Sequence, residues 1–368
     1  MIPNSFYYSH DVFRQEMDRV FPAGFEFVCL LSELREDKDF VCIDYQGCAV
    51  VVQNFKGELK AFKNVCSHRF NKIQFEDKGN RPLTCRYHGW SYNAAGLPIG
   101  VANRIEPLDL AEDYLCLTRY RIEVCGQFVF VARNESPQTL REFLGVFHDV
   151  LENLSASLGP QIHFGQVPHK ANWKVLVENV IDNQHCALLH RETFVSFGFC
   201  RTPVEEVVTE GLHSSWHVPR TPMDRDGLRR RALSHLQSRT FAHDSFYHIY
   251  IFPNLFIAST EGISFYIGHA LPLSAEETLL RVRYHEPAVE LKPSERVRQD
   301  LLNEQTRVYG LEIVEEDRPI LESIQKGVQL ANNPGVTSKG EPRIREFMDR
   351  YMDMMRSRQV SEAGTYES

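Results

Sequence analysis

Residues 64–92 read NVCSHRFNKIQFEDKGNRPLTCRYHGWSY and hold two cysteines and two histidines in two short groups. Cys66 and His68 form C-x-H, Cys85 and His88 form C-x-x-H, and sixteen residues separate the two groups. Each group offers one thiolate and one imidazole, ligands that hold iron–sulfur clusters or zinc. The stretch therefore predicts a metal site built from two loops.

The order of these ligands favours an iron–sulfur cluster over zinc. Zinc modules usually group their cysteines and their histidines, whereas here the two types alternate. Gly89 permits close approach of the backbone to a cluster, and imidazoles in place of two thiolates raise the reduction potential. The pattern resembles the Rieske [2Fe-2S] domain of ring-hydroxylating oxygenases. This resemblance implies that Cys66 and Cys85 bind one iron and that His68 and His88 bind the other, with a zinc site as the alternative.

A second group of candidate ligands lies in ENVIDNQHCALLH, residues 178–190, where Asp182, His185 and His190 are spaced D-x-x-H-x-x-x-x-H. Two imidazoles and one carboxylate leave open positions on ferrous iron. On a regular α-helix the two histidines would point roughly 140° apart, so we expect a π-bulge or a break near residues 186–188. Asp182 and His185, three residues apart, can share a helix face.

The resemblance to the oxygenase large subunit extends to this group and to the preceding NWKVLVEN, residues 172–179. It implies that His185 and His190 bind a mononuclear non-haem Fe(II). It also implies that Asp182 is an electron-transfer bridge, which contacts His185 in its own chain and His88 of a neighbouring subunit. A pair of histidines found alone would more simply be polar residues on an ordinary helix.

The third iron ligand is expected to be Asp317 in VEEDRPILESIQ, residues 314–325. The family's following acid and amide are matched by Glu322 and Gln325. The alternative carboxylates are Glu315 and Glu316. Asp317 could also be a helix-start residue, because Pro319 suits a first turn and acids favour that end. We expect the helix to be interrupted at Pro319, which would free Asp317 to point inward.

Hydrophobic patterning predicts an α+β fold. Short β-type runs fill residues 26–132, strand runs and a long helical stretch at 292–330 follow later, and βα units do not alternate. Residues 9–21 predict an amphipathic helix capped by Ser9, and residues 133–165 one or two connecting helices. The expected organisation is an N-terminal helical segment at 1–24, an antiparallel β Rieske domain at 25–135, and a catalytic domain with an antiparallel sheet flanked by helices at 136–368.

Composition excludes several classes of partner. The 368 residues carry 41 basic and 49 acidic side chains, a net charge of −8, and no basic stripe dominates any region, so nucleic acid is not expected. No apolar stretch approaches the roughly 20 residues that span a bilayer. The start of the chain has no signal-peptide pattern. We expect a cytoplasmic protein whose nine cysteines are reduced.

The resemblance implies a terminal oxygenase that uses O2 to hydroxylate a small organic, aromatic substrate by monooxygenation, dioxygenation or oxidative demethylation. No G-x-G-x-x-G loop is present, so NAD(P)H is expected to act only through a separate reductase, with a ferredoxin as a further carrier. The bridge between subunits implies an oligomer, and the resemblance implies that it is a homotrimer. The alternative function is a Rieske-type electron carrier, or a zinc-stabilised binding protein, without oxygenase activity.

The substrate pocket is the part least defined by motifs. Aromatic residues after the second histidine and on the strands are expected to line it, although core packing explains each equally well. They are Phe194, Phe197, Phe246 and Phe265. The polar, charged segment 219–244 is expected to be a solvated helix or loop, with a mobile cover over the pocket as the alternative.

Overall fold

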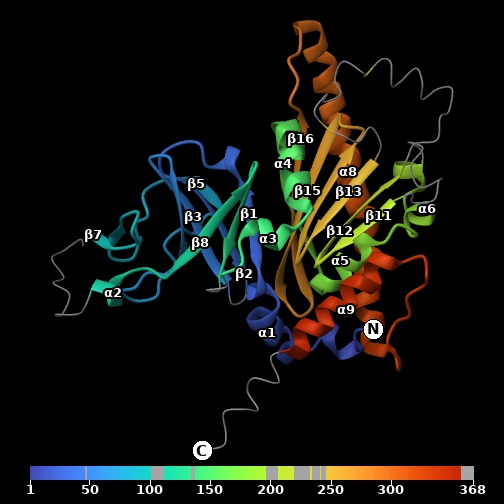
Figure 1. The fold of residues 1–368 in the computed structure, drawn as a ribbon, viewed down its shortest axis with the longest axis horizontal. Helices are drawn as coiled ribbons and strands as arrows, with labels where there is room; N and C mark the ends of the chain where they lie inside the picture. Colours follow the sequence, from blue (N-terminus) through green and yellow to red (C-terminus); the bar gives the residue numbers. More distant parts are fainter. Residues whose placement is uncertain are drawn as a thin grey trace, which may run out of the picture. The chain divides into compact units, whose positions relative to one another are not determined.

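The computed structural model describes residues 1–45, 48–100, 112–133, 137–195, 206–218, 233, 241 and 246–357. The chain forms two compact units (Figure 1). One unit is Phe21–Phe143, and the other joins Met1–Val20 to Leu144–Ser368. The first twenty residues, expected within a separate segment at 1–24, thus belong to the second unit. The segment 219–244 lies outside the described residues apart from Leu233 and Phe241.

The unit Phe21–Phe143 is built on an antiparallel β-sheet. Among its described residues the sheet has seven strands in the order β1-β9-β8-β4-β3-β2-β5. Their bounds are β1 (Phe25–Leu30), β2 (Asp39–Tyr45), β3 (Cys48–Phe55), β4 (Glu58–Lys63), β5 (Lys78–Asn80), β8 (Arg119–Cys125) and β9 (Phe128–Ala132). Short elements add β6 (Ser91–Tyr92), β7 (Pro98–Gly100), α2 (Glu112–Leu115), η2 (Phe21–Ala23) and η3 (Leu31–Glu33). β-branched and aromatic residues fill the buried faces of the strands, as the sequence predicts.

The second unit also has an antiparallel sheet, whose seven described strands run in the order β10-β16-β15-β14-β13-β12-β11. Their bounds are β10 (Leu158–His169), β11 (Glu206–Glu210), β12 (His213–Val218), β13 (Phe246–Ile251), β14 (Leu255–Thr260), β15 (Ser264–Ser274) and β16 (Glu277–Pro287). The predicted α+β class, an N-terminal β region followed by an antiparallel sheet flanked by helices, is confirmed.

Helices flank this second sheet, and the long α8 runs alongside it in Figure 1. The helices are η1 (Asn4–Tyr7), α1 (His10–Arg19), α4 (Phe147–Ser157), α5 (Trp173–Ile181), α6 (Cys186–Leu189), the π-helical η4 (Arg191–Val195), α8 (Pro293–Leu330) and α9 (Pro342–Ser357). α3 (Leu140–Leu144) lies at the point in the sequence where the first unit ends. The predicted opening helix is confirmed, because Ser9 Oγ accepts a hydrogen bond from the Val12 amide at 3.4 Å. The connector contains two helices, α3 and α4.

The expected interruption of the last long helix is wrong. α8 continues from Pro293 to Leu330 with Pro319 inside it. Proline removes one backbone donor and disfavours a helix interior, yet α8 packs against β10 and β16 of the sheet and contacts α5. Asp317 therefore faces inward from an unbroken helix, and not from a helix start.

A buried polar cluster fixes the start of α5. The Lys174 ammonium lies 2.5 Å from Glu16 Oε1, and both side chains are fully buried. Trp173 Nε1 donates to Glu16 Oε2 at 2.9 Å, and the Tyr351 hydroxyl also donates to Glu16. Burial lowers the pKa of Lys174, and the attraction of Glu16 opposes this effect. One carboxylate thus joins helices α1, α5 and α9.

A second set of hydrogen bonds ties α5 to α8. Asn172 is the N-cap of α5, and its side-chain Oδ1 accepts a hydrogen bond from the Lys174 backbone amide at 2.9 Å. The backbone amide of Asn172 donates to Gln325 Oε1 at 2.8 Å. Gln325 is buried on α8 and donates through Nε2 to the Tyr7 carbonyl at 3.0 Å. The helices that lead to the candidate iron ligands are therefore held together by groups buried away from water.

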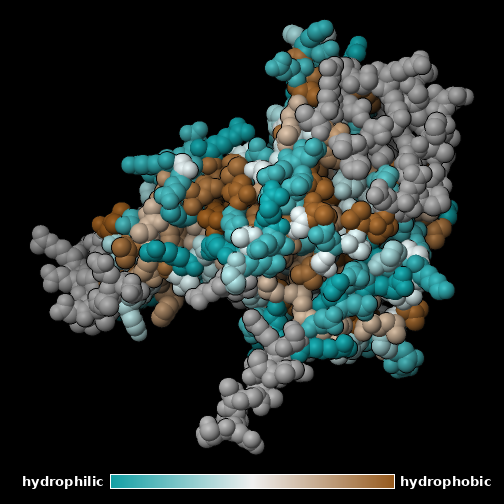
Figure 2. All heavy atoms as spheres, viewed as in Figure 1, coloured by the Kyte–Doolittle hydropathy of each residue, from teal (hydrophilic) through white to brown (hydrophobic). Residues whose placement is uncertain are grey.

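The described helices include none that is long and apolar enough to cross a membrane. On the face drawn in Figure 2, hydrophilic side chains cover much of the surface, and hydrophobic residues form smaller groups between them.

The Glu16 cluster predicts a large loss of stability on truncation. Glu16→Ala would leave the Lys174 ammonium buried without a partner, which costs about 3–5 kcal/mol. We expect the free energy of unfolding, measured by urea denaturation, to fall by that amount. Glu346→Ala, which breaks an exposed pair with Arg350, is the matched control and should change it by less than about 1 kcal/mol. Equal losses in the two variants would contradict this role.

Two candidate metal centres

The loops that carry the cysteine–histidine pairs have the same backbone geometry. In the first loop the Cys66 amide donates to the Asn71 carbonyl at 2.8 Å, and in the second the Cys85 amide donates to the Trp90 carbonyl at the same distance. The fourth residue after each cysteine has a left-handed φ, 58° at Phe70 and 75° at Gly89. Each loop therefore folds back over its cysteine and presents one thiol and one imidazole.

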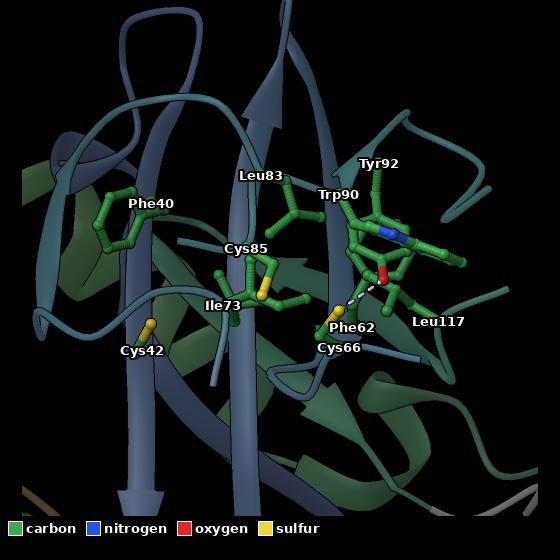
Figure 3. Close-up of a cluster of buried hydrophobic side chains, with 11 residues drawn as sticks. Phe40, Cys42, Phe62, Cys66, Ile73, Leu83, Cys85, Trp90, Tyr92 and Leu117 are labelled. Carbon is green, nitrogen blue, oxygen red and sulfur yellow. Dashed lines mark hydrogen bonds between the residues drawn. The ribbon is translucent and has the colours of Figure 1, made fainter. Parts of the chain in front are cut away.

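The two loops bring their donors together. Cys66 and Cys85 are buried in one hydrophobic cluster with Trp90 and Tyr92 (Figure 3). The rings of His68 and His88 lie 4.7 Å apart, and His68 stacks on Trp90 at 4.9 Å. The structure thus sorts the donors into a buried thiol pair and an imidazole pair.

Polar groups surround the thiols in a way that suits a cluster. The Tyr92 hydroxyl lies 3.1 Å from Cys66 Sγ, with the dashed line in Figure 3 marking the contact, and Asn71 Nδ2 donates to Cys85 Sγ at 3.5 Å. Hydrogen bonds to sulfur are among the factors that set a cluster's reduction potential. His88 Nδ1 is buried and has no partner among the described residues. The two thiols and the two imidazoles, one of which has this ring nitrogen available as a ligand, fit a Rieske cluster.

The chain between α5 and η4 is irregular, but not where the sequence analysis places the irregularity. α5 ends at Ile181, and Asp182 is extended with φ −76° and ψ 135°. Residues 186–188, where we expected the break, form part of the short helix α6. The irregular turns lie on either side, at residues 182–185 and in the π-helical η4. The short helix α6 lies between the two histidines, and the backbone leaves helical geometry at His190, with φ −98° and ψ 46°. The predicted break at residues 186–188 is therefore wrong.

Asp182 and His185 meet through a turn and not through a shared helix face. Asp182 Oδ1 accepts from the Gln184 amide at 2.8 Å, and Oδ2 lies 3.2 Å from His185 Nδ1. Burial alone would raise the pKa of Asp182, but hydrogen bonds from the His185 ring and from the backbone amides lower it below its ordinary value. An ionised Asp182 accepts a hydrogen bond from the N–H group at His185 Nδ1. The other ring nitrogen, Nε2, is then available as a ligand.

His190 is held in the same manner. Its Nδ1 donates to Glu316 Oε2 at 2.6 Å, and Thr193 Oγ1 donates to the same oxygen at 2.9 Å. Burial lowers the pKa of His190, but Asp317 and Glu316 outweigh this effect and raise it. Glu316 is thus occupied in orienting a ring, and His190 Nε2 is left facing Asp317.

Three donor atoms converge. Asp317 Oδ1 lies 3.2 Å from His190 Nε2 and 3.8 Å from His185 Nε2. This oxygen is buried and has no hydrogen-bond partner among the described residues, which is costly unless a cation or proton compensates it. Two imidazoles and this carboxylate fit a divalent iron with open coordination positions. Glu316 is turned to His190 Nδ1, and Glu315 pairs with Arg318 on the exposed side of α8.

Cys186 is a buried neighbour of this group. Its thiol lies 3.9 Å from His185 Nε2, and the donors of His185, Cys186 and His190 lie within 4.8 Å of one another. Both histidines point their Nε2 atoms at Asp317 at shorter distances. Cys29, Cys42, Cys48 and Cys125 are buried, Cys116 is partly exposed, and Cys200 lies outside the described residues.

A cavity of about 220 Å³ opens beside the three donors. Three of the four aromatic residues expected to line it do so, namely Phe194, Phe246 and Phe265. Phe197 lies outside the described residues. The sequence analysis missed other lining residues, among them Trp216, His248, Tyr266, Tyr284 and Tyr309. Strand alternation predicts only that such side chains point inward, and it carries no signal that they border a cavity.

Comparison with known proteins agrees with this geometry. The family model of the ring hydroxylating alpha subunit (catalytic domain) matches residues 154–357, and that of the Rieske [2Fe-2S] domain matches residues 25–108. The chain belongs to the ring hydroxylating alpha subunit family. It is a Rieske non-haem iron oxygenase, an oxidoreductase whose cofactors are a [2Fe-2S] cluster and a mononuclear iron. The alternatives without a catalytic iron domain do not account for the match over residues 154–357.

Named relatives act on different molecules. The oxygenase subunit of glycine betaine monooxygenase from Chromohalobacter salexigens is 25% identical, over 98% of this chain and 87% of its own length. The fold is similar to that of the quaternary ammonium Rieske monooxygenase CntA, with a TM-score of 0.77 at 21% identity over 96% of this chain and 95% of that one. It is also similar to naphthalene 1,2-dioxygenase from Rhodococcus sp., with a TM-score of 0.75 at 18% identity over 97% and 94%.

The convergence on Asp317 Oδ1 predicts how iron content responds to mutation. Asp317→Ala should lower the total from about three irons per chain to about two, with the EPR signal of the reduced cluster unchanged. Glu316→Gln should weaken the mononuclear site by about 10–100-fold, because it loosens His190. Glu315→Ala, on the exposed side of α8, is the matched control. Loss of iron in Glu315→Ala with retention in Asp317→Ala would contradict the assignment.

Proposed function

We propose that this oxygenase subunit oxidises a small organic molecule held in the cavity beside His185, His190 and Asp317. The observation that carries the proposal is the convergence of two ring Nε2 atoms and one buried carboxylate oxygen at the wall of an aromatic-lined cavity. When bound, the mononuclear iron supplies O2 activation and the [2Fe-2S] cluster supplies single electrons.

The ligand assignments are part of the proposal. Cys66 and Cys85 hold one iron of the cluster and His68 and His88 hold the other. His185, His190 and Asp317 hold the mononuclear iron. The carboxylates of Asp182 and Glu316 accept hydrogen bonds from Nδ1–H of His185 and His190. These hydrogen bonds fix the orientation of both rings. The unit Phe21–Phe143 is the cluster domain, and the unit that joins Met1–Val20 to Leu144–Ser368 is the catalytic domain.

The cavity wall carries out the remaining tasks. Its apolar and aromatic side chains exclude water from the reacting carbon, and their shape orients the substrate. Relatives act on glycine betaine, on quaternary ammonium compounds and on naphthalene. Hydroxylation of one carbon, dioxygenation of a ring and oxidative demethylation all remain within reach of such a site, because fold alone does not fix the reaction.

Electrons come from a separate reductase, directly or through a ferredoxin, because the chain has no G-x-G-x-x-G loop of its own. We propose that the working unit is a homotrimer in the cytoplasm, in which Asp182 connects His185 to His88 of a neighbouring subunit. The side chains of Asp182 and His185 are partly exposed, at 17% and 21%, as a contact with another chain requires.

The oxygenase activity is tested with labelled oxygen. Holoenzyme, reductase and NADH are incubated under 18O2 with a panel of aromatic and quaternary ammonium compounds, and products are analysed by mass spectrometry. We expect label in a hydroxylated product, or release of formaldehyde with consumption of one O2 where the product is demethylated, and about a thousandfold less product with His185→Ala. A hydroxylated product without label, or unchanged turnover in His185→Ala, would contradict the proposal.

The bridge predicts a separate defect in electron transfer. Asp182→Asn removes the carboxylate charge but retains the shape, and it should leave the cluster content within error of wild type. Because Asp182 also orients His185, the mononuclear site should weaken by about 10–100-fold, so the variant is loaded with excess Fe(II) until its iron content equals that of wild type. Stopped-flow absorbance should show reoxidation of the reduced cluster by O2 slowed by about 10–100-fold. Asp353→Asn on α9 is a control outside the site, and sedimentation tests the trimer. Unchanged reoxidation in Asp182→Asn would remove Asp182 from the electron path.

A further inference from the structure

Two buried N–H donors at one end of the cavity have no partner. Trp216 on β12 and His248 on β13 are directly opposed in the strand register, and both line the cavity. They are 4% and 5% exposed. Neither Trp216 Nε1 nor His248 Nε2 has a hydrogen-bond partner among the described residues. Buried polar groups are nearly always paired, so two neighbouring exceptions that border a cavity point to a ligand.

The tautomer of His248 is fixed by a hydrogen bond from Arg343. Arg343 on α9 donates through Nη2 to His248 Nδ1 at 3.2 Å, and its Nε donates to Ser214 Oγ at 2.9 Å. Arginine has no acceptor atom, so Nδ1 must accept and the ring proton must sit on Nε2. Burial and the Arg343 charge lower the pKa of His248 well below its ordinary value. His248 is therefore neutral, with Nε2–H on the ring edge away from Arg343.

Arg343 brings an uncompensated positive charge to this end of the cavity. The side chain is buried, at 4% exposed, and within the described part of the chain no carboxylate forms an ion pair with it. Burial lowers the pKa of Arg343 to about 9, which keeps the guanidinium charged near neutral pH. A buried cation without a counter-ion is destabilising. An anion in the cavity would compensate it through the intervening imidazole.

The donors lie across an aromatic wall from the candidate iron ligands. Ring contacts lead from His190 to Phe194 at 5.5 Å, from Phe194 to Phe246 at 5.2 Å, from Phe246 to Trp216 at 5.5 Å and from Trp216 to His248 at 6.0 Å. Among the described residues, the carboxylates that line the cavity are Asp182 and Asp317, and both lie beside the candidate iron ligands. Negative charge therefore lies at the iron ligands, and the positive charge of Arg343 lies behind His248.

We propose that His248 and Trp216 bind an oxyanion group of the substrate, a carboxylate or a sulfonate, through His248 Nε2–H and Trp216 Nε1–H. Arg343 acts as a positioning residue that fixes the imidazole tautomer and supplies the positive field. The inference rests on the proposed function, since the bound anion is the molecule to be oxidised. A ligand held in this way places its apolar body along Phe246 and Phe194 and its far end beside the iron ligands. A substrate with only a cationic group at this end is disfavoured by the guanidinium.

The test is ligand binding by the intact holoenzyme, measured by isothermal titration calorimetry without turnover. The probes are pairs of similar shape: benzoate and benzamide, cyclohexanecarboxylate and its amide, and hexanoate and its amide, with benzenesulfonate added. We expect the anion of at least one pair to bind about tenfold or more tightly than its amide, because hydrogen bonds to a charged acceptor are stronger. Trp216→Phe and His248→Phe should each weaken anion binding by about tenfold and reduce the anion-to-amide ratio.

Phe246→Leu is the matched control, because it alters the same wall without removing an N–H. It should weaken both members of a pair alike and leave their ratio unchanged. Circular dichroism and the EPR signal of the reduced cluster verify that each variant is folded, and Trp216→Phe serves if His248→Phe does not fold. Equal binding of anions and amides, ratios unchanged in both donor variants, or no saturable anion binding below about 10 mM would each overturn the inference.

Iron content and 18O2 incorporation on the same preparations separate this outcome from the function itself. A protein that holds both metals and oxygenates neutral compounds, but shows no preference for anions, keeps the proposed function and loses the oxyanion site. A protein that lacks the mononuclear iron fails at the proposed function, whatever it binds.

Discussion

The structure of the second unit depends on one constraint, the convergence of His185, His190 and Asp317 at a single buried point. The three residues come from segments far apart in the sequence, and a displacement of about 1 Å would matter for chemistry at such a site. Buried contacts hold these segments in place. Glu16 joins the start of α5 to α1 and α9, and Asn172 with Gln325 joins α5 to α8. Stability and metal binding therefore draw on the same helices.

Sequence reasoning performs best where the chemistry is local. The spacing of Cys66, His68, Cys85 and His88 defines two loops, and the structure brings their donors together. Helical rotation predicts a break between His185 and His190, but the structure keeps the short helix α6 between them and leaves helical geometry only at His190. The extended turn at Asp182 depends on its carboxylate capping later amides. The path of α8 through Pro319 depends on packing that only the folded chain supplies.

The residues that sequence reasoning misses are those whose meaning depends on distant partners. The sequence identifies His248 only as an inward-facing residue of a strand. Its tautomer becomes evident only from the hydrogen bond with Arg343 on α9. Glu316 and Asp317 are adjacent acids until the fold turns one to His190 Nδ1 and the other to both Nε2 atoms. Oxygen chemistry, ligand orientation and substrate position thus arise from a short motif combined with long-range packing.

The central claim is that His185, His190 and Asp317 hold one iron while the paired loops hold two. An anomalous difference map from crystals of the anaerobic holoprotein, with data on both sides of the iron absorption edge, tests this claim most directly. We predict one isolated iron peak bound by the two Nε2 atoms and an Asp317 oxygen, and a two-iron peak bound by Cys66, Cys85, His68 and His88. No iron peak between the histidines and Asp317, or a zinc edge at the paired loops, would contradict the account.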